Sequence, residues 1–339
     1  MLASDQIGSI TGTSISDRGV LDLNGFSETL SGILTLDSSP SSGAQITTGA
    51  GTLTLGGNVG MSTTNGGGGG TSISGHLDLG GATRTFSPGG VAPVDIDISA
   101  IMSGTGAGIT VNGFSGTLRF SGSASNTYTG PTTVSAGTLE LAKSGSAVAV
   151  PSVLTIGGGV NAPNSAIVRE LVANKIGDGV AVTVASDGLL DLNGFSDTIG
   201  SLASGGNVSL GNATLTTGGD GTSTIFSGVI GGTGGNLNKM GAGTFTLAGT
   251  LANTYTGVTT VTAGTLALNK TASVDAIAAS SGLTIGGFGS PATARLLASD
   301  QIADATEVLA RGGGSSTSTG SRTPLASWPC SSTRRVPGR

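Results

Sequence analysis

Short segments in which apolar and polar residues alternate run through most of the chain, separated by glycine-rich turns. The pattern Gly-Thr-apolar-x-apolar begins at Gly51, Gly116, Gly137, Gly243 and Gly264. Because successive side chains of a strand point to opposite faces, the two apolar residues of each segment share one face. The best-defined predicted core residues are Leu118, Phe120, Leu139, Leu141, Phe245, Leu247, Leu266 and Leu268. The polar residues between them, such as Arg119, Glu140 and Thr246, are predicted to face the solvent.

These segments repeat on two scales. Asn126–Leu139 returns almost unchanged as Asn253–Leu266, and Leu21–Thr29 returns as Leu190–Thr198. Within the larger unit the Gly-Thr pattern recurs about every 20 residues, a length that matches one coil of a solenoid. A short strand with one apolar face cannot bury it alone, whereas stacked coils bury it continuously. The sequence predicts an all-β parallel β-helix of glycine-rich coils; a sandwich of hairpins is the alternative, because Asn-Gly pairs also form hairpin turns.

Composition narrows the fold class further. Glycine supplies 63 of the 339 residues, while 10% of the residues are charged and 3% are aromatic. Interior glycines disfavour long helices, and the absence of a Gly-X-Y period excludes collagen. Regular apolar positions argue against disorder. The single cysteine, Cys330, lies near the C-terminus, so residues 1–310 are predicted to hold no disulfide and no thiolate metal site.

The distribution of charged residues and of apolar stretches limits which partners and which location the chain can have. The net charge is −5, and five arginines but no acidic residue lie in 311–339. Residues 1–310 contain no basic cluster that would suit a nucleic acid. Residues 1–5 lack the basic and apolar parts of a signal peptide, and no apolar stretch is long enough for a transmembrane helix. With aromatic residues too few for a membrane barrel, we expect no membrane insertion of this segment.

Two segments, 103–141 and 230–268, resemble autotransporter-associated β-strand repeats. Their shared pattern is Gly-Thr-Gly, then Gly-Thr-Leu/Phe-x-Phe/Leu, then Asn-Thr-Tyr-Thr-Gly-x-Thr-Thr-Val-x-Ala-Gly-Thr-Leu. With the flanking Leu-Asp-Leu-Asn-Gly-Phe-Ser segments, the resemblance covers nearly all of 1–310. It implies the passenger region of a large exported bacterial protein, folded as a β-helix and either secreted or located at the cell surface. Such proteins usually carry an N-terminal signal and a C-terminal barrel, and this chain is expected to lack both.

The function that the resemblance implies is structural or adhesive, without catalysis. Surface glycans and proteins of host or neighbouring cells are the expected partners. The repeats bring no catalytic residue, cofactor or metal site. A β-helix enzyme that degrades polysaccharides and a gene fragment without function are the alternatives. Because both ends of the stacked coils would be uncapped, we expect residues 1–310 to associate end to end.

Residues 311–339 are predicted to form a disordered basic tail. After Ala310 the repeat should continue as Leu-Leu-Asp-Leu-Asn-Gly-Phe, but three glycines and a Ser-Thr-rich run follow. In the neighbouring reading frame, each new codon consists of the third base of one residue's codon and the first two bases of the next. Read in this way, the segment restores the sequence of Leu189–Ala203 at all but one position. We infer that 315–339 is a frameshifted translation of a further repeat, which the nucleotide sequence of this region tests.

Paired carboxylates are the clearest chemical candidates in the sequence. Asp95 and Asp97 lie two positions apart in Val-Asp-Ile-Asp-Ile, and glycosidases use such pairs of carboxylates. The plainer explanation is a solvated strand face opposite the inward-facing Val94, Ile96 and Ile98. The alternation of polar and apolar residues explains this segment without catalysis.

Other candidates have structural explanations as well. His76 is the only histidine, so no second histidine exists for a metal site, and we expect it to be an exposed polar residue. Tyr128 and Tyr255 recur in the motif and are predicted to pack or to stabilise a turn. Rows of outward threonines would suit a regular surface such as ice or a glycan. Their spacing along the sequence varies too much to predict such a site.

Overall fold

Strands and turns make up the whole of the described part of the chain. The structure is a computed structural model, and it describes residues 3–7, 12–63, 68–278, 282–286, 290–312 and 314–318. No helix that could span a membrane occurs among these residues. The chain divides into two compact units, Met1–Ile176 and Gly177–Arg339.

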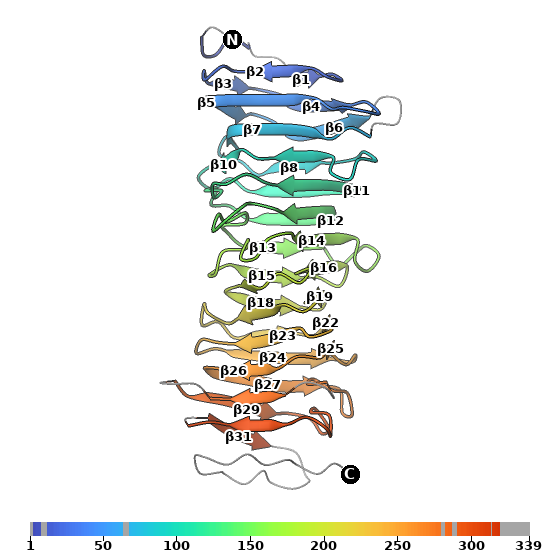
Figure 1. Cartoon of the computed structure of the whole chain (residues 1–339), viewed down its shortest axis with the longest axis vertical. Helices are drawn as coiled ribbons and strands as arrows, with labels where there is room; N and C mark the ends of the chain where they lie inside the picture. The colour runs from blue at the N-terminus through green and yellow to red at the C-terminus, as the bar shows by residue number, and fades with distance from the viewer. Residues whose placement is uncertain are drawn as a thin grey trace. The chain divides into compact units, whose positions relative to one another are not determined.

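The first unit consists of short strands that stack in successive layers, drawn from blue to green in Figure 1. In chain order they are β1 (Gly12–Ile15), β2 (Val20–Asp22), β3 (Glu28–Leu30), β4 (Ile33–Ser38), β5 (Gln45–Leu55), β6 (Val59–Thr63), β7 (Thr71–Asp78), β8 (Arg84–Ser87), β9 (Ile96–Ile98), β10 (Ile101–Ser103), β11 (Ile109–Phe120), β12 (Thr132–Leu141), β13 (Leu154–Ile156) and β14 (Ala166–Glu170). Each strand pairs with a strand of the next coil. For example, β1 pairs with β4, β5 with β7, and β11 with β12.

All strand pairings of the first unit that the structure describes are parallel. A sandwich built from hairpins would instead pair neighbouring strands antiparallel. The predicted parallel β-helix is therefore confirmed, and the sandwich alternative is wrong. The long strand β11 follows two sides of its coil, because its first part pairs with β8 and its last part with β9. Its pairing register with β12 shifts between Asn112 and Thr117, which marks the bend.

The second unit is built in the same way and is drawn from yellow-green to red in Figure 1. Its strands are β15 (Ala181–Val184), β16 (Gly188–Asp191), β17 (Asp197–Thr198), β18 (Ser201–Ser204), β19 (Asn207–Ser209), β20 (Thr214–Thr217), β21 (Thr224–Phe226), β22 (Val229–Gly232), β23 (Asn236–Lys239), β24 (Thr244–Gly249), β25 (Thr254–Tyr255), β26 (Thr259–Val261), β27 (Gly264–Lys270), β28 (Leu283–Ile285), β29 (Ala292–Leu296), β30 (Val308–Ala310) and β31 (Gly314–Ser318). They form three parallel ladders. One of these, β17-β20-β23-β26-β28-β30, is a separate six-stranded sheet.

The apolar residues of alternating segments line the inside of each unit. The eight residues predicted from the Gly-Thr segments are each at most 2% exposed: Leu118, Phe120, Leu139, Leu141, Phe245, Leu247, Leu266 and Leu268. In β24, Thr244 and Thr246 alternate with this buried set and are half-buried. The alternation therefore places each segment's apolar side in the core.

The segment predicted to be a disordered tail starts with ordered structure. Strand β31 lies within 311–339 and pairs in parallel with β29. The rest of that segment, 319–339, lies outside the described residues, as do Trp328 and Cys330.

Candidate functional site

Each copy of the long motif places a buried asparagine between neighbouring coils. The backbone N–H of Met102 donates to Oδ1 of Asn126 at 3.1 Å, and Nδ2 of Asn126 donates to the carbonyl of Ala149 at 2.8 Å. Asn253 makes the equivalent two bonds in the second unit, at 3.0 and 2.9 Å. Both asparagines are 2% exposed. Their side chains link the preceding coil to the following one and are not available to a ligand.

The tyrosines of the motif also make hydrogen bonds inside their coils. The hydroxyl of Tyr128 lies 2.6 Å from Oγ1 of Thr132, and Tyr255 lies 2.5 Å from Thr259 in the same way. Both tyrosines are at most 1% exposed. Burial raises the pKa of both phenol groups. These contacts agree with the predicted packing role.

All four lysines of the chain are buried, a feature that the sequence analysis missed. Lys143, Lys175, Lys239 and Lys270 are at most 1% exposed, although lysine is usually a surface residue. Burial lowers the pKa of Lys143, Lys239 and Lys270 to about 8. Two of these lysines, Lys143 and Lys270, end the same Leu-x-Leu-x-Lys segment in the two copies. That recurrence is the signal in the sequence that could have revealed them.

Backbone carbonyls surround the buried ammonium groups. Nζ of Lys143 donates to the carbonyl of Ser121 at 2.9 Å and approaches that of Ala100 at 3.5 Å. Lys270 occupies the equivalent place in the second repeat and donates to two carbonyls at 2.9 and 3.0 Å. Nζ of Lys175 donates to two carbonyls at 2.7 and 2.9 Å. The lysines therefore link coils and are not accessible as nucleophiles.

The carboxylate pair does not lie on a common solvated face. Asp95 is 1% exposed, so the expectation of a solvated face is wrong for it. Its Oδ2 accepts a hydrogen bond from the backbone N–H of Thr117 at 2.7 Å. Burial raises the pKa of Asp95, and the amide of Thr117 lowers it in part. Asp95 precedes β9, where Ile96 and Ile98 are buried as expected.

Asp97 belongs to a column of charged residues on the outside of the first unit. It pairs in register with Arg119, Arg119 with Glu140, and Glu140 with Arg169. The guanidinium of Arg119 lies 2.7 Å from Oε2 of Glu140. Alternating signs place each charge beside an opposite one, which stabilises the outer face without creating a charged patch.

His76 is half-buried, so the expectation of an exposed side chain is wrong. It lies on β7, and its backbone N–H donates to Oγ1 of Thr48 at 2.8 Å. Its ring Nδ1 is shielded from solvent and has no hydrogen-bond partner among the described residues. Within that same part of the chain, no group of three or more His, Cys, Asp or Glu side chains could hold a metal ion.

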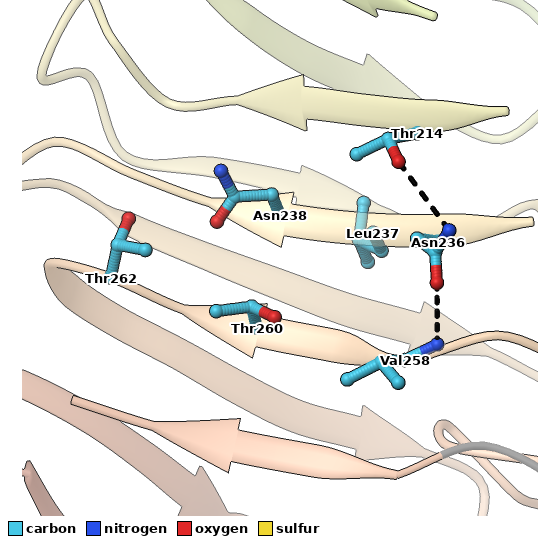
Figure 2. A pocket seen from close by; sticks show the side chains of 7 residues that line it. All are labelled: Thr214, Asn236, Leu237, Asn238, Val258, Thr260 and Thr262. Atoms are coloured by element: carbon cyan, nitrogen blue, oxygen red, sulfur yellow. Dashed lines mark hydrogen bonds between the residues drawn. The ribbon is translucent and has the colours of Figure 1, made fainter. Parts of the chain in front are cut away.

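A shallow hollow opens on the outer face of the sheet formed by β20, β23 and β26 (Figure 2). Its volume is about 290 Å³, and it is lined by Thr214, Asn236, Leu237, Asn238, Val258, Thr260 and Thr262. None of these residues carries a charge. Sequence reasoning did not predict this site, because its residues come from three coils and their alignment depends on the lengths of the intervening turns.

Comparison with known proteins identifies the repeats. The family described as Passenger-associated-transport-repeat matches residues 115–141 and 237–268, which lie within the two predicted repeats. The chain is also similar to the adhesin BmaC autotransporter of Brucella suis biovar 1 (strain 1330), with 35% identity over 189 residues. That alignment covers 49% of this chain and 5% of the adhesin, so the chain spans a small fraction of its relative's length. No solved structure matches the chain. The predicted resemblance to autotransporter passenger repeats is confirmed.

Proposed function

We propose that this chain, which carries two passenger-associated transport repeats, is a non-catalytic adhesive segment of a surface-exposed or secreted autotransporter-like passenger. One observation carries the proposal: the inward-facing asparagines and tyrosines of the motif make hydrogen bonds between and within coils in both units. Asn126 and Asn253 show this most clearly. The inward side of the motif therefore builds a scaffold, and contact with partners is left to the outward-facing residues.

The resemblance to an adhesin supports the adhesive part of the proposal. Stacked parallel coils present long outer columns of side chains, which suits repeated weak contacts with a cell surface. Glycans or proteins on host or neighbouring cells are the partners we propose. The end-to-end association of residues 1–310 stays a prediction, which light scattering at increasing concentration tests.

The geometry favours this function over cleavage of polysaccharides. A retaining or inverting glycosidase needs two carboxyl groups that flank one bond of the substrate. Asp95 is buried, and its Oδ2 accepts a hydrogen bond from Thr117. This favours a structural role for Asp95 and leaves Asp97 without the second accessible carboxylate that the reaction would need.

Adherence of protein-coated beads tests the proposal. Because all four lysines are buried, the full chain should be attached through a terminal biotin tag rather than by amine coupling. We expect the beads to bind cultured epithelial cells or bacteria several-fold more than albumin-coated beads, with competition by free chain. Equal binding by the two kinds of bead would contradict the adhesive function. Release of reducing ends from a polysaccharide by the same chain would instead support the enzyme.

A further inference from the structure

The hollow on β20, β23 and β26 is lined by side chains that are held in fixed positions. Nδ2 of Asn236 reaches Oγ1 of Thr214 at 3.4 Å, and its Oδ1 accepts the backbone N–H of Val258 at 2.8 Å. Figure 2 shows both bonds joining three neighbouring strands or turns at one end of the hollow. At the other end, the hydroxyl of Thr262 donates to the carbonyl of Lys239 at 3.0 Å. The walls are therefore preformed.

The middle of the hollow contains an unused acceptor. Oδ1 of Asn238 is shielded from bulk solvent and has no hydrogen-bond partner among the described residues. Thr260 lies beside it in register on the next strand, as Figure 2 shows. A shielded polar atom without a partner is costly. If the half-buried side chain of Asn238 turns outward, a ligand group that donates a hydrogen bond to Oδ1 would be favoured.

Hydroxyl and amide groups continue in register beyond the hollow. Thr198, Thr216, Asn238, Thr260 and Thr284 follow one another on adjacent strands of the same sheet. Adjacent strands lie about 4.8 Å apart. The variable spacing of outward threonines in the sequence is thus removed in the structure, because turns of different length absorb it. The surface is a regular line of neutral groups.

We propose that this hollow and the column through it bind a segment of a neutral polysaccharide. The inference rests on the adhesive function proposed above and names the site and the ligand class. Amide and hydroxyl groups both donate and accept hydrogen bonds, as sugar hydroxyls do. The lining contains no arginine or lysine to pair with a sulfate, phosphate or carboxylate. Val258, which is 42% exposed, provides an apolar contact for the C–H groups of a sugar ring.

A protein partner fits the same surface less well. Peptides that add to a sheet use an unpaired strand edge, whereas β23 is paired on both sides, with β20 and β26. Protein interfaces centre on aromatic or arginine anchors, and the lining holds neither. Each sugar contact would be weak, so binding would depend on a long chain that occupies several positions of the column.

The first repeat supplies a matched control. Thr133 lies in register with Thr110 on the equivalent sheet of the first unit, at the place that Thr260 occupies beside Asn238 in the second. The first repeat therefore has threonine where the second has the unpartnered asparagine. Asn238→Thr copies the first repeat into the hollow, and Thr133→Val removes a hydroxyl from the other unit only.

Binding of the full chain to immobilised dextran, mannan and galactan, with heparin as the anionic comparison, tests the proposal. We expect binding to at least one neutral polysaccharide and not to heparin. Asn238→Thr and Thr260→Val should each weaken it by about fivefold, the effect of one lost hydrogen bond. Thr133→Val shortens the equivalent threonine line of the first unit but lies outside the hollow, so it should leave binding within about twofold. Equal thermal unfolding of all variants would show that the losses are local.

Three results would overturn the proposal. They are binding to heparin alone, binding to none of the four polysaccharides, and neutral binding that Asn238→Thr and Thr260→Val leave unchanged. If coated beads still adhere to cells in any of these cases, the adhesive function stands and the assigned site is wrong. If bead adherence fails while the two variants weaken polysaccharide binding, the site stands and the adhesive function is wrong.

Discussion

The two repeats share much of their interior and differ at several positions of their outer surface. Asn126 and Asn253 make equivalent bonds, and Lys143 and Lys270 donate to carbonyls in the same way. On the outside, by contrast, the first repeat carries charged residues at positions where the second carries neutral ones. Inward residues that are identical in the two copies thus hold one coil to the next. Outward residues, whether shared or different, are the ones that the fold leaves free for contact with partners.

One outer difference involves two positions that changed together. In the first repeat Gly108 lies against Pro131, whose carbonyl a Cβ on Gly108 would meet. In the second repeat Asn236 and Val258 stand at these places, and the N–H of Val258 donates to the asparagine. Proline has no N–H to offer. The hydrogen bond at the edge of the hollow therefore needs both residues of the second repeat, and glycine and proline at these places could not form it.

The largest effect should come from breaking the shared interior. Asn126→Ala removes the partner of the Met102 N–H and leaves buried groups unsatisfied, which should cost about 3 kcal/mol. Amide hydrogen exchange at Met102 should then be about 100-fold faster, while the amide of Ile230, which bonds to Asn253, keeps its rate. Exposed Asn112→Ala is the matched control. Equal acceleration at Met102 and Ile230 would show that the two units do not open separately.

Gly108 and Pro131, the two outer positions described above, should give the next largest effect on stability. Gly108→Asn places a side chain against Pro131, and overpacking of this kind costs about 1–3 kcal/mol. Combining it with Pro131→Val rebuilds the arrangement of the second repeat and should restore at least about 1 kcal/mol. Urea midpoints from circular dichroism of the two single variants and the double variant measure this coupling. Additive losses would mean that the pair in the second repeat depends on other residues.

The buried lysines should make stability depend on pH. The folded-state pKa of Lys143 and Lys270 is about 8, below the ordinary value of 10.5. Between these values the unfolded chain binds more protons, so stability should rise with pH, by about 2 kcal/mol or less for each lysine. Above about pH 10 the trend should reverse, because the buried tyrosines resist ionisation that the unfolded chain allows.

Variants of Lys143 and Lys270 test whether the two lysines cause this pH dependence and whether they do so in the same way. Urea midpoints at pH 7.5 and pH 9.5 should differ less in Lys143→Met and Lys270→Met than in the parent chain. Burial lowers the pKa of both lysines; on Lys143, the charge of Asp97 also raises the pKa and that of Lys175 lowers it. Added salt should therefore alter the effect of Lys143→Met more than that of Lys270→Met. An unchanged pH dependence in both variants would exclude the lysines as its source.

The strands and the core could be predicted because alternation is a local property. Leu139 and Leu141 face inward for reasons contained in their own segment, and repetition of that segment implies stacked coils. Lys143 could not be placed in the same way. Its ammonium is buried because carbonyls of earlier coils surround it, and those carbonyls belong to residues that carry no signal of their own.

Sites formed across coils were missed for a related reason. Asn238 and Thr260 become neighbours through the pairing of β23 with β26, and that pairing depends on the length of each turn. The same limit applies to Asp95, which is buried and accepts a hydrogen bond from the amide of Thr117 in the next coil. Spacing along the chain indicates which face a residue takes. It does not indicate which residues of other coils lie beside it.

The smallest expected effect concerns the charged column of the first unit. Arg119 and Glu140 form an ion pair at 2.7 Å, with side chains that are 33% and 12% exposed. The second repeat has Thr246 and Ala267 at these places, which also pair in register. A double-mutant cycle with Arg119→Thr and Glu140→Ala should give a coupling of about 0.5–1 kcal/mol.

Two further measurements distinguish electrostatic coupling between Arg119 and Glu140 from packing of their side chains: added salt, and transfer of the ion pair into the second repeat. In 1 M salt the coupling should fall by about half or more, because the pair is partly exposed. Thr246→Arg with Ala267→Glu should create a coupling of similar size in the second unit, since the strands there pair in the same register. A coupling that salt does not change would point to packing of the long side chains. A graft that unfolds the second unit would show that the outer columns are not independent of the interior, and would remove the basis for assigning partner contacts to them.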